Sequence, residues 1–220
     1  KIDGAFGNTV EFWLNKTDFV GASNQKEVIL DVYTPDHESG SADYGRFLIE
    51  ITDASSPFVF SYVSGTAGFV NQSIGSTLNG SSISDKKWHH YALSVGNVSG
   101  ALQARLYVDG VLSETLTRSE TISAVKSHHA ATLGSLAKPN LSTGGLGYGK
   151  LSASLDDFRY WKEIRSPKNI RTYFDKQVYG GTAVDTSNPT LGVYYKFNEG
   201  ITEDAEFDKI ILDYSGRLNN

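Results

Sequence analysis

The chain of 220 residues contains neither cysteine nor methionine. Without cysteine, disulfide bonds, thiol catalysis and thiolate metal sites are all excluded. Secreted animal proteins often carry disulfide bonds, so the absence of cysteine favours a bacterial or viral source. Position 1 is lysine rather than methionine, so we expect the chain to be a piece excised from a longer polypeptide.

Three further absences narrow the class of function. No apolar run is long enough to span a bilayer and no segment has the pattern of a signal peptide, so we expect no membrane insertion. The net charge is -5 and no basic patch is large enough to follow a phosphate backbone, so nucleic acid is not an expected partner. The Gly-x-Ser-x-Gly motif of many serine hydrolases is also absent.

The residues that are abundant are those of β-structure. The chain has 22 glycines, 12 tyrosines and 11 phenylalanines, a balance typical of aromatic strands separated by tight turns. Its hydrophobic content of 39% is enough for one sizeable core. Since β-sandwiches commonly reach this length as one unit, a single domain is expected.

The clearest local signal is a hairpin. In Leu102–Val108 the apolar residues alternate with polar ones, which predicts a strand with one buried face. Asp109-Gly110 follows directly and favours a two-residue turn, because both central positions of such a turn need a positive φ. Trp88–Val95 alternates in the same way, so an antiparallel meander is predicted here.

Similar short segments recur along the whole chain, separated by Gly, Ser, Asn and Asp. Their spacing predicts a β-sandwich or barrel. The expected strands are Thr9–Leu14, Glu27–Tyr33, Arg46–Ile51, Phe58–Val63, Trp88–Val95, Leu102–Val108, Val111–Thr117, Ala130–Gly134, Lys150–Trp161 and Leu191–Phe197.

Only one segment is predicted to be helical. Ser166 is a good N-cap and Pro167 suits the first helical position. Ile170, Tyr173 and Phe174 would then share one face. We expect this short helix to lie as a lid across one end of the sandwich.

Several of these segments together resemble a known group. They resemble the laminin G-like, pentraxin-like branch of the concanavalin A-like lectin/glucanase superfamily over about residues 8 to 175. This resemblance implies a jelly roll of two curved antiparallel sheets, but no single activity. The segments that carry it are Thr9–Leu14, Trp88–Leu93, Leu106–Gly110, Leu155–Trp161 and Ile164–Ser166.

The C-terminal part resembles the start of such a unit rather than its end. Tyr194–Gly200 and Asp213–Asn220 carry this likeness. The segment either pairs back onto the sandwich, which we prefer because it would cover an open sheet edge, or begins a following module. The expected organisation is a core at 1–175, a linker at 176–190 and a returning strand with its tail at 191–220.

Catalysis is not expected. The glucanases of the superfamily resemble one another in a Glu-x-Asp-x-Glu strand that supplies nucleophile and acid, and this triplet is absent here. Of the adjacent His89 and His90 only one can face inward, so we interpret the inward one as a packed histidine. His128 and His129 lack a third zinc ligand nearby.

The resemblance also raises the question of calcium. Where pentraxin-like relatives carry an acidic loop, Ser135–Ser142 has no carboxylate, so that ligand site is not expected. Some superfamily members hold a structural ion where the first strand meets the last, which implies Asp157, Glu199 and Asp213 as calcium ligands here. The alternative is a solvated acidic loop in which Asp157 caps backbone amides.

Two loops are candidates for ligand binding, 37–44 and 143–149. Sugars stack on aromatic rings and hydrogen-bond to polar groups, so Asp43, Tyr44 and Tyr148 are the candidate residues.

The sequence therefore favours a non-catalytic recognition or adhesion module of a larger extracellular, cell-surface or virion protein. Its expected partners are a glycan or a cell-surface protein, together with neighbouring modules of the same parent chain. Two alternatives stay open: a purely structural decoration or spacer domain, and a divergent glycoside hydrolase.

Overall fold

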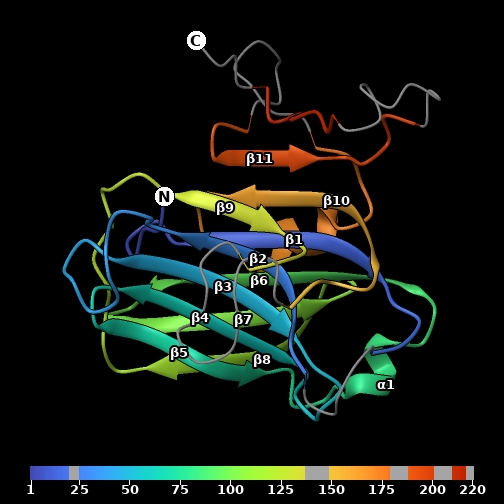
Figure 1. The fold of residues 1–220 in the computed structure, drawn as a ribbon, viewed down its shortest axis with the longest axis horizontal. Helices are drawn as coiled ribbons and strands as arrows, with labels where there is room; N and C mark the ends of the chain where they lie inside the picture. Colours follow the sequence, from blue (N-terminus) through green and yellow to red (C-terminus); the bar gives the residue numbers. More distant parts are fainter. Residues whose placement is uncertain (20–24, 137–148, 179–187, 201–209, 217–220) are drawn as a thin grey trace.

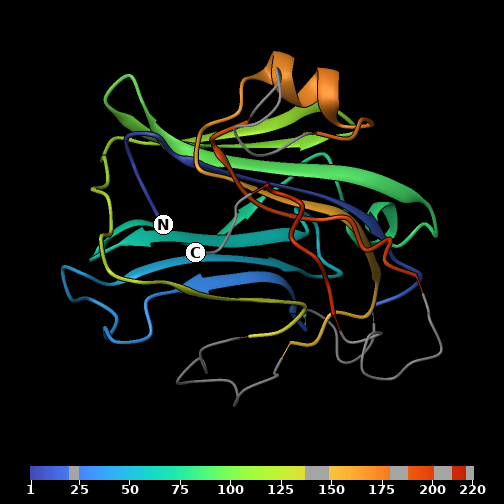
Figure 2. The same ribbon diagram turned by 90° about the horizontal axis from the view of Figure 1, so that it is seen from above.

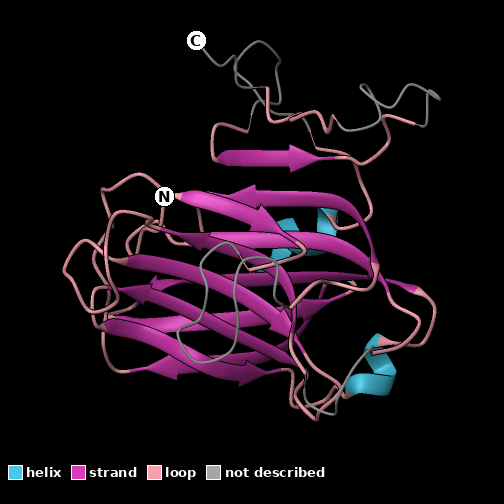
Figure 3. Ribbon diagram, in the orientation of Figure 1, coloured by secondary structure: helices cyan, strands magenta, loops and turns pink. Residues whose placement is uncertain are grey.

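Two antiparallel sheets pack face to face in this protein (Figure 1). The computed structural model describes residues 1–19, 25–136, 149–178, 188–200 and 210–216. Strands dominate these residues, and the helices are short (Figure 3). Neither helix in the described part of the chain is long and apolar enough to cross a membrane.

The six-stranded sheet has the order β11-β10-β1-β6-β7-β8. Its strands are β1 (Asn8–Asn15), β6 (Trp88–Val98), β7 (Ala101–Val108), β8 (Val111–Arg118), β10 (Ser154–Trp161) and β11 (Leu191–Tyr195). The five-stranded sheet has the order β5-β4-β3-β2-β9. Its strands are β2 (Glu27–Tyr33), β3 (Gly45–Ile51), β4 (Phe58–Ser64), β5 (Ala67–Ile74) and β9 (Ala130–Leu133).

The core lies between the two sheets and is rich in aromatic rings. Phe12 and Tyr91 of one sheet and Phe58 of the other are at most 2% exposed. The Tyr91 ring lies 5.9 Å from Phe12 and 4.9 Å from Phe58, so it joins the two inner faces. The predicted all-β jelly-roll sandwich is confirmed.

The predicted hairpin is also confirmed. Val108 pairs with Val111, which leaves Asp109-Gly110 as a two-residue turn. Asp109 has φ 48° and Gly110 has φ 75°, the positive values that such a turn requires.

Two elements were missing from the sequence prediction. One is β5, whose burial does not alternate regularly because its register with β4 shifts and Asn71 has φ 46°. The other is the four-residue α1 (Gly80–Ile83), which is too short to show helical periodicity. It is held by a capping box in which the Asn79 side chain accepts from Ser82 N at 2.9 Å.

The second helix, α2 (Pro167–Tyr173), begins as predicted but lies elsewhere. Ser166 is its N-cap and accepts a hydrogen bond from Asn169 N at 3.1 Å. Buried Ile170 packs against Ala92 of β6 and Tyr107 of β7, on the outer face of the six-stranded sheet. Figure 2 shows α2 above that sheet. The expectation of a lid across one end is therefore wrong, because the apolar side chain of Ile170 finds its apolar partners on the sheet face.

β11 is the edge strand of the six-stranded sheet. It pairs antiparallel with β10, with Phe158 opposite Tyr195 and Tyr160 opposite Val193. Its outer edge makes an isolated bridge from Tyr195 to Asp213. The domain boundaries at 175 and 190 stay a prediction.

Candidate ligand-binding site

Three neighbouring strands bring polar and aromatic side chains together at one end of the six-stranded sheet. Asn15 of β1 lies opposite Trp88 of β6 on one side and Ser154 of β10 on the other. Directly opposed residues of antiparallel strands share a face, and adjacent strands lie about 4.8 Å apart. Trp88, Asn15 and Ser154 therefore form a row about 10 Å wide across the sheet.

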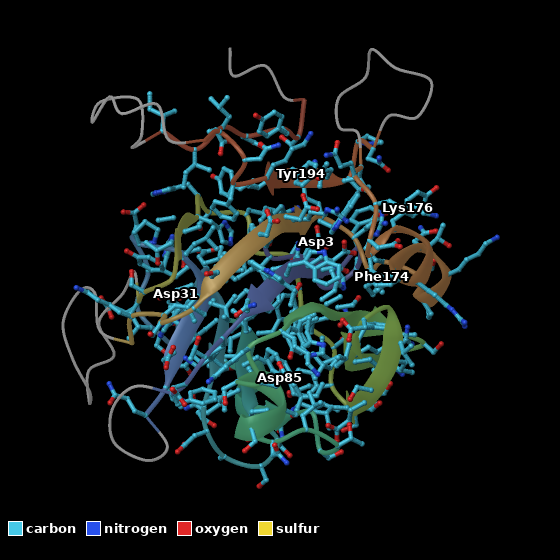
Figure 4. The ribbon with its side chains drawn as sticks, turned by 90° about the vertical axis from the view of Figure 1, so that its right-hand side faces the viewer. Asp3, Asp31, Asp85, Phe174, Lys176 and Tyr194 are labelled. Atoms are coloured by element: carbon cyan, nitrogen blue, oxygen red, sulfur yellow. The ribbon has the colours of Figure 1, made fainter. Side chains whose placement is uncertain are left out.

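This row lies just beyond the end of α2. Trp13 and His90 are the next residues of β1 and β6 on the same face as Asn15 and Trp88. They are covered by Phe174, at ring-centroid distances of 6.2 Å and 5.8 Å. Trp13 Nε1 also donates to the carbonyl oxygen of Phe174 at 3.1 Å. Trp88, by contrast, is 45% exposed. Figure 4 faces this end of the sandwich and labels Phe174 and Asp85 there.

A polar cleft adjoins the row. It has a volume of about 360 Å³ and is lined by Asn15, Thr17, Asp18, Ser152, Ala153 and Ser154. Amide and hydroxyl groups both donate and accept hydrogen bonds and a carboxylate accepts them, so this lining can pair with sugar hydroxyls. The exposed indole of Trp88 beside them adds a flat apolar surface. A polar cleft next to an aromatic face suits a saccharide.

A buried ion pair supports the cleft wall. Lys16 Nζ lies 2.8 Å from both Glu27 carboxylate oxygens, and the two side chains are 0% and 4% exposed. Lys16 Nζ also donates to the carbonyl oxygen of Ser152 at 2.9 Å, while Ser152 N donates to Glu27 Oε2 at 2.8 Å. All three ammonium protons are therefore used inside the protein. The pair ties Ser152 to β1 and β2, and thus holds the cleft in shape.

A second charged group lies beneath α2 and is fully enclosed. Glu11 lies 3.6 Å from Arg159 Nη1 and 3.5 Å from Arg165 Nε, with side chains between 1% and 4% exposed. Burial raises the pKa of Glu11, and the two arginines oppose that rise. Arg165 also stacks on Trp161 at 3.7 Å. Because all three charged side chains are enclosed, we interpret their role as structural.

The histidines differ in burial and in their hydrogen-bond partners. His90 is 1% exposed, and burial, with a smaller contribution from Arg159, lowers its pKa to about 3. It is a packed neutral histidine, although it faces α2 rather than the core between the sheets. His128 Nδ1 contacts Asp36 at 3.0 Å, and His129 Nε2 accepts from Ile2 N at 3.4 Å.

The structure places the predicted ligand residues away from this row. β2 runs from Glu27, beside Lys16, to Tyr33, so the following loop with Asp43 and Tyr44 lies at the opposite end of the sandwich. Asp43 is exposed, whereas Tyr44 is only 6% exposed and offers little ring surface. Tyr148 lies outside the described residues. Ligand binding at these residues stays a prediction.

The predicted calcium ligands each bind protein donors. Asp157 accepts from Tyr194 Oη at 2.7 Å, and Asp213 accepts from Tyr194 N at 2.9 Å. Glu199 Oε1 accepts from Leu212 N at 3.0 Å. Over the described part of the chain, no three His, Asp or Glu side chains gather into a metal-binding group. Tyr194 thus links two of the three carboxylates, and calcium binding stays a prediction.

A second cavity opens between the sheets. It measures about 370 Å³ and lies between β9 and the β10–β11 pair. Its walls are mainly apolar, with Leu30 and Leu133 from one sheet and Phe158 and Val193 from the other. With so few polar groups it is a poor match for sugar hydroxyls.

Sequence comparison identifies the family of this chain. Residues 3–171 match a laminin G family described as the concanavalin A-like lectin/glucanases superfamily. The chain belongs to this superfamily. The resemblance seen in the sequence is thereby confirmed for this laminin G-like domain. No curated protein sequence matches it.

Solved structures share the fold of this laminin G-like domain at low sequence identity. A heptameric SAP-like pentraxin from Limulus polyphemus is 12% identical with a TM-score of 0.51, covering 79% of this chain and 72% of that chain. The CBM40 domain of the IT-sialidase from Ruminococcus gnavus is 12% identical with a TM-score of 0.52, covering 77% and 83%.

Proposed function

We propose that this laminin G-like domain is a non-catalytic recognition module that binds neutral glycans at the Trp88 row and its polar cleft. The observation that carries the proposal is the exposed indole of Trp88 beside a cleft of amide, hydroxyl and carboxylate groups. The superfamily description, which names lectins and glucanases, agrees with a sugar as the common ligand class.

Charge supports a neutral ligand. Among the described residues that line the cleft, Asp18 is the sole charged one, and its carboxylate repels acidic sugars. The nearest buried cation, Lys16, has its three protons taken by Glu27 and Ser152. A carboxylate accepts hydrogen bonds from neutral sugar hydroxyls.

The cleft supports binding rather than hydrolysis. Glycosidases use two carboxyl groups, about 5 Å apart in retaining enzymes and about 6.5–9.5 Å apart in inverting ones. The described cleft lining carries the carboxylate of Asp18 without an acidic partner in that lining. A divergent glycoside hydrolase is therefore the weaker candidate.

We infer further that the module works outside the cell, on a cell surface or on a virion, joined to neighbouring modules. A structural spacer role is the second candidate. It is favoured by three consecutive aliphatic residues, Ile210, Ile211 and Leu212, which are 50–52% exposed and suit contact with another protein surface.

A glycan array tests the proposal. Neutral galactose-, glucose- and mannose-terminated oligosaccharides are compared with sialylated and sulfated ones. We expect neutral binding that Trp88→Ala weakens about tenfold, the size of one aromatic stacking contact. The matched control is Phe6→Ala, since Phe6 is a 71% exposed aromatic residue that precedes β1, at the other end of that strand. Binding that is absent, or equal in Trp88→Ala, contradicts the proposal.

A further inference from the structure

We propose that His89 is a positioning residue for Trp88, and that its protonated ring holds the start of β6 in the ligand-binding arrangement. Glycan binding then weakens as the pH rises. This inference rests on the proposed glycan site, but its central step concerns Trp88 itself and can be tested without a glycan.

The His89 ring lies between two carboxylates from different elements. Nδ1 is 2.8 Å from Asp109 Oδ2, in the turn between β7 and β8. Nε2 is 3.3 Å from Asp85 Oδ2, in the connection between α1 and β6. The ring therefore links the segment that precedes Trp88 to the neighbouring hairpin turn.

The second oxygen of each carboxylate holds the backbone beside Trp88. Asp109 Oδ1 accepts from His90 N at 2.8 Å, and Asp85 Oδ1 accepts from Lys87 N at 3.0 Å. These two amides lie on either side of Trp88 in the chain. The two carboxylates and the imidazole thus form one continuous hydrogen-bonded bracket around the backbone of Trp88.

The protonation state decides how many of these contacts exist. An imidazolium ring has two N–H donors, one for each carboxylate. A neutral ring has one, and its other nitrogen then presents a lone pair to a carboxylate oxygen, which is repulsive. The longer contact, to Asp85, is the one we expect to break. Its loss releases the segment before Trp88, because the described contacts that Asp85 then keeps are with Lys87, in that same segment.

The charged and titratable groups around the ring come from several elements. Asp85 and Asp109 face it directly, and Lys87 lies 3.8 Å from Asp85 but is 76% exposed. Tyr91 of β6 lies 6.3 Å from the ring. On the α2 side, the backbone of Arg171 lies close to Gly110 of the same turn, where its Cα would be 3.2 Å from an added Cβ. The two carboxylates are thus the groups in hydrogen-bonding contact with the imidazole.

The direction of the pH effect follows from the pKa. Burial lowers the pKa of His89, and the hydrogen bonds to Asp109 and Asp85 more than offset it, so the pKa is raised above 6.5. The bracket is therefore complete below about pH 6.5 and is lost as the pH rises through the raised value.

Acrylamide quenching of Trp88 fluorescence tests the positioning role of His89 without a glycan. The protein is measured between pH 5.5 and 8.5, and Trp88→Phe serves as the blank for the other two tryptophans. We expect quenching of Trp88 to increase with pH in the wild-type protein. His89→Gln should show the high-pH value throughout, while His89→Arg, always charged, should keep the low-pH value.

His128→Gln is the matched control, because this histidine also contacts a carboxylate but lies at 65% exposure beside Asp36. It should follow the wild-type profile. Quenching that does not change with pH, or that changes equally in His89→Gln, overturns the proposal.

Binding to the neutral oligosaccharide panel at pH 5.5 and 8.5 completes the test. We expect an affinity about fivefold weaker at pH 8.5, as for one lost hydrogen bond, and an unchanged affinity in His89→Arg. If no oligosaccharide binds but Trp88 quenching still follows His89, the glycan function fails and the positioning role stands. If binding is present but independent of pH, the positioning role fails and the glycan function stands.

Discussion

Arg159 of β10 donates a 2.9 Å hydrogen bond from Nη1 to the carbonyl oxygen of Tyr173, the last residue of α2. Its Nη2 donates to the carbonyl oxygen of Lys176 at 2.6 Å. A helix end leaves carbonyls such as that of Tyr173 without intrahelical partners, and here a buried guanidinium donates to it. Phe174 lies between these two residues, so Arg159 also positions the ring that borders the Trp88 row.

Arg159→Met should lower the free energy of unfolding by about 3–5 kcal/mol. The substitution leaves Glu11 buried with one of its two cations missing, and removing one partner of a buried ion pair costs about that much. Denaturant unfolding measures the change. Arg118→Met is the control, since the Arg118–Glu120 pair is 46% and 37% exposed and should matter by less than about 0.5 kcal/mol. Equal effects of the two substitutions would contradict the assigned role.

His90 should make the protein less stable in acid. Its folded-state pKa of about 3 lies below the usual 6.5, so the unfolded chain binds the extra proton between these values. Stability is therefore full above about pH 6.5 and falls by about 1.4 kcal/mol per pH unit as the pH drops toward 3.

His90→Phe should remove this slope and leave the stability at pH 7 nearly unchanged, because both ring nitrogens lack a hydrogen-bond partner among the described residues. Unfolding free energies between pH 4 and 7.5 measure it, with His128→Gln as the control. An identical slope in His90→Phe and the wild-type protein would sink this interpretation.

The Lys16–Glu27 pair should behave as one unit. Lys16→Met alone should destabilise by about 3–5 kcal/mol, because it leaves a carboxylate buried without its cation. The double variant Lys16→Met/Glu27→Leu should recover much of this loss, since replacing both charges by apolar groups is often neutral. A double-mutant cycle on unfolding free energies gives the coupling. Additive effects would show that the two charges do not depend on each other.

Gly110 should tolerate a side chain less well than Gly100. Both have positive φ, 75° and 82°, so alanine strains the backbone by about 1–2 kcal/mol at either position. At Gly110 an added Cβ would also lie 2.8 Å from Phe174 Cδ1, whereas none of the described residues has an atom within 4 Å of a Cβ at Gly100. Gly110→Ala should therefore be the more destabilising in thermal unfolding. Equal losses would mean that the turn and Phe174 are not in close contact.

Calcium binding at Asp157, Glu199 and Asp213 should make the thermal stability of the protein depend on the ion. If the ion links β10 to the C-terminal segment, EDTA should lower the melting temperature and added calcium should restore it. Asp213→Asn should abolish that response. A melting temperature that is the same in EDTA and in calcium contradicts the site.

Signals that depend on a few adjacent residues were predicted reliably. Asp109-Gly110 and the Ser166 cap are examples, because a tight turn and a helix start are set by local φ values and local hydrogen bonds. β5 escaped prediction because its register shift breaks the period-two pattern. The candidate calcium ligands came from the family resemblance and the candidate loop residues from side-chain type, and neither carries information on side-chain contacts.

The sequence by itself determined the strands other than β5, the hairpin and the superfamily, since alternation, turn chemistry and motif order are properties of short stretches. Only the tertiary structure decided that Trp88, Asn15 and Ser154 form one row, because strands from distant parts of the chain set their registers by packing a common core. It also decided that Phe174, directly after α2, covers Trp13 and His90 yet leaves Trp88 exposed. Alternation assigns Trp88 to the same face as His90, but the position of Phe174 after the end of α2 decides which of the two meets solvent.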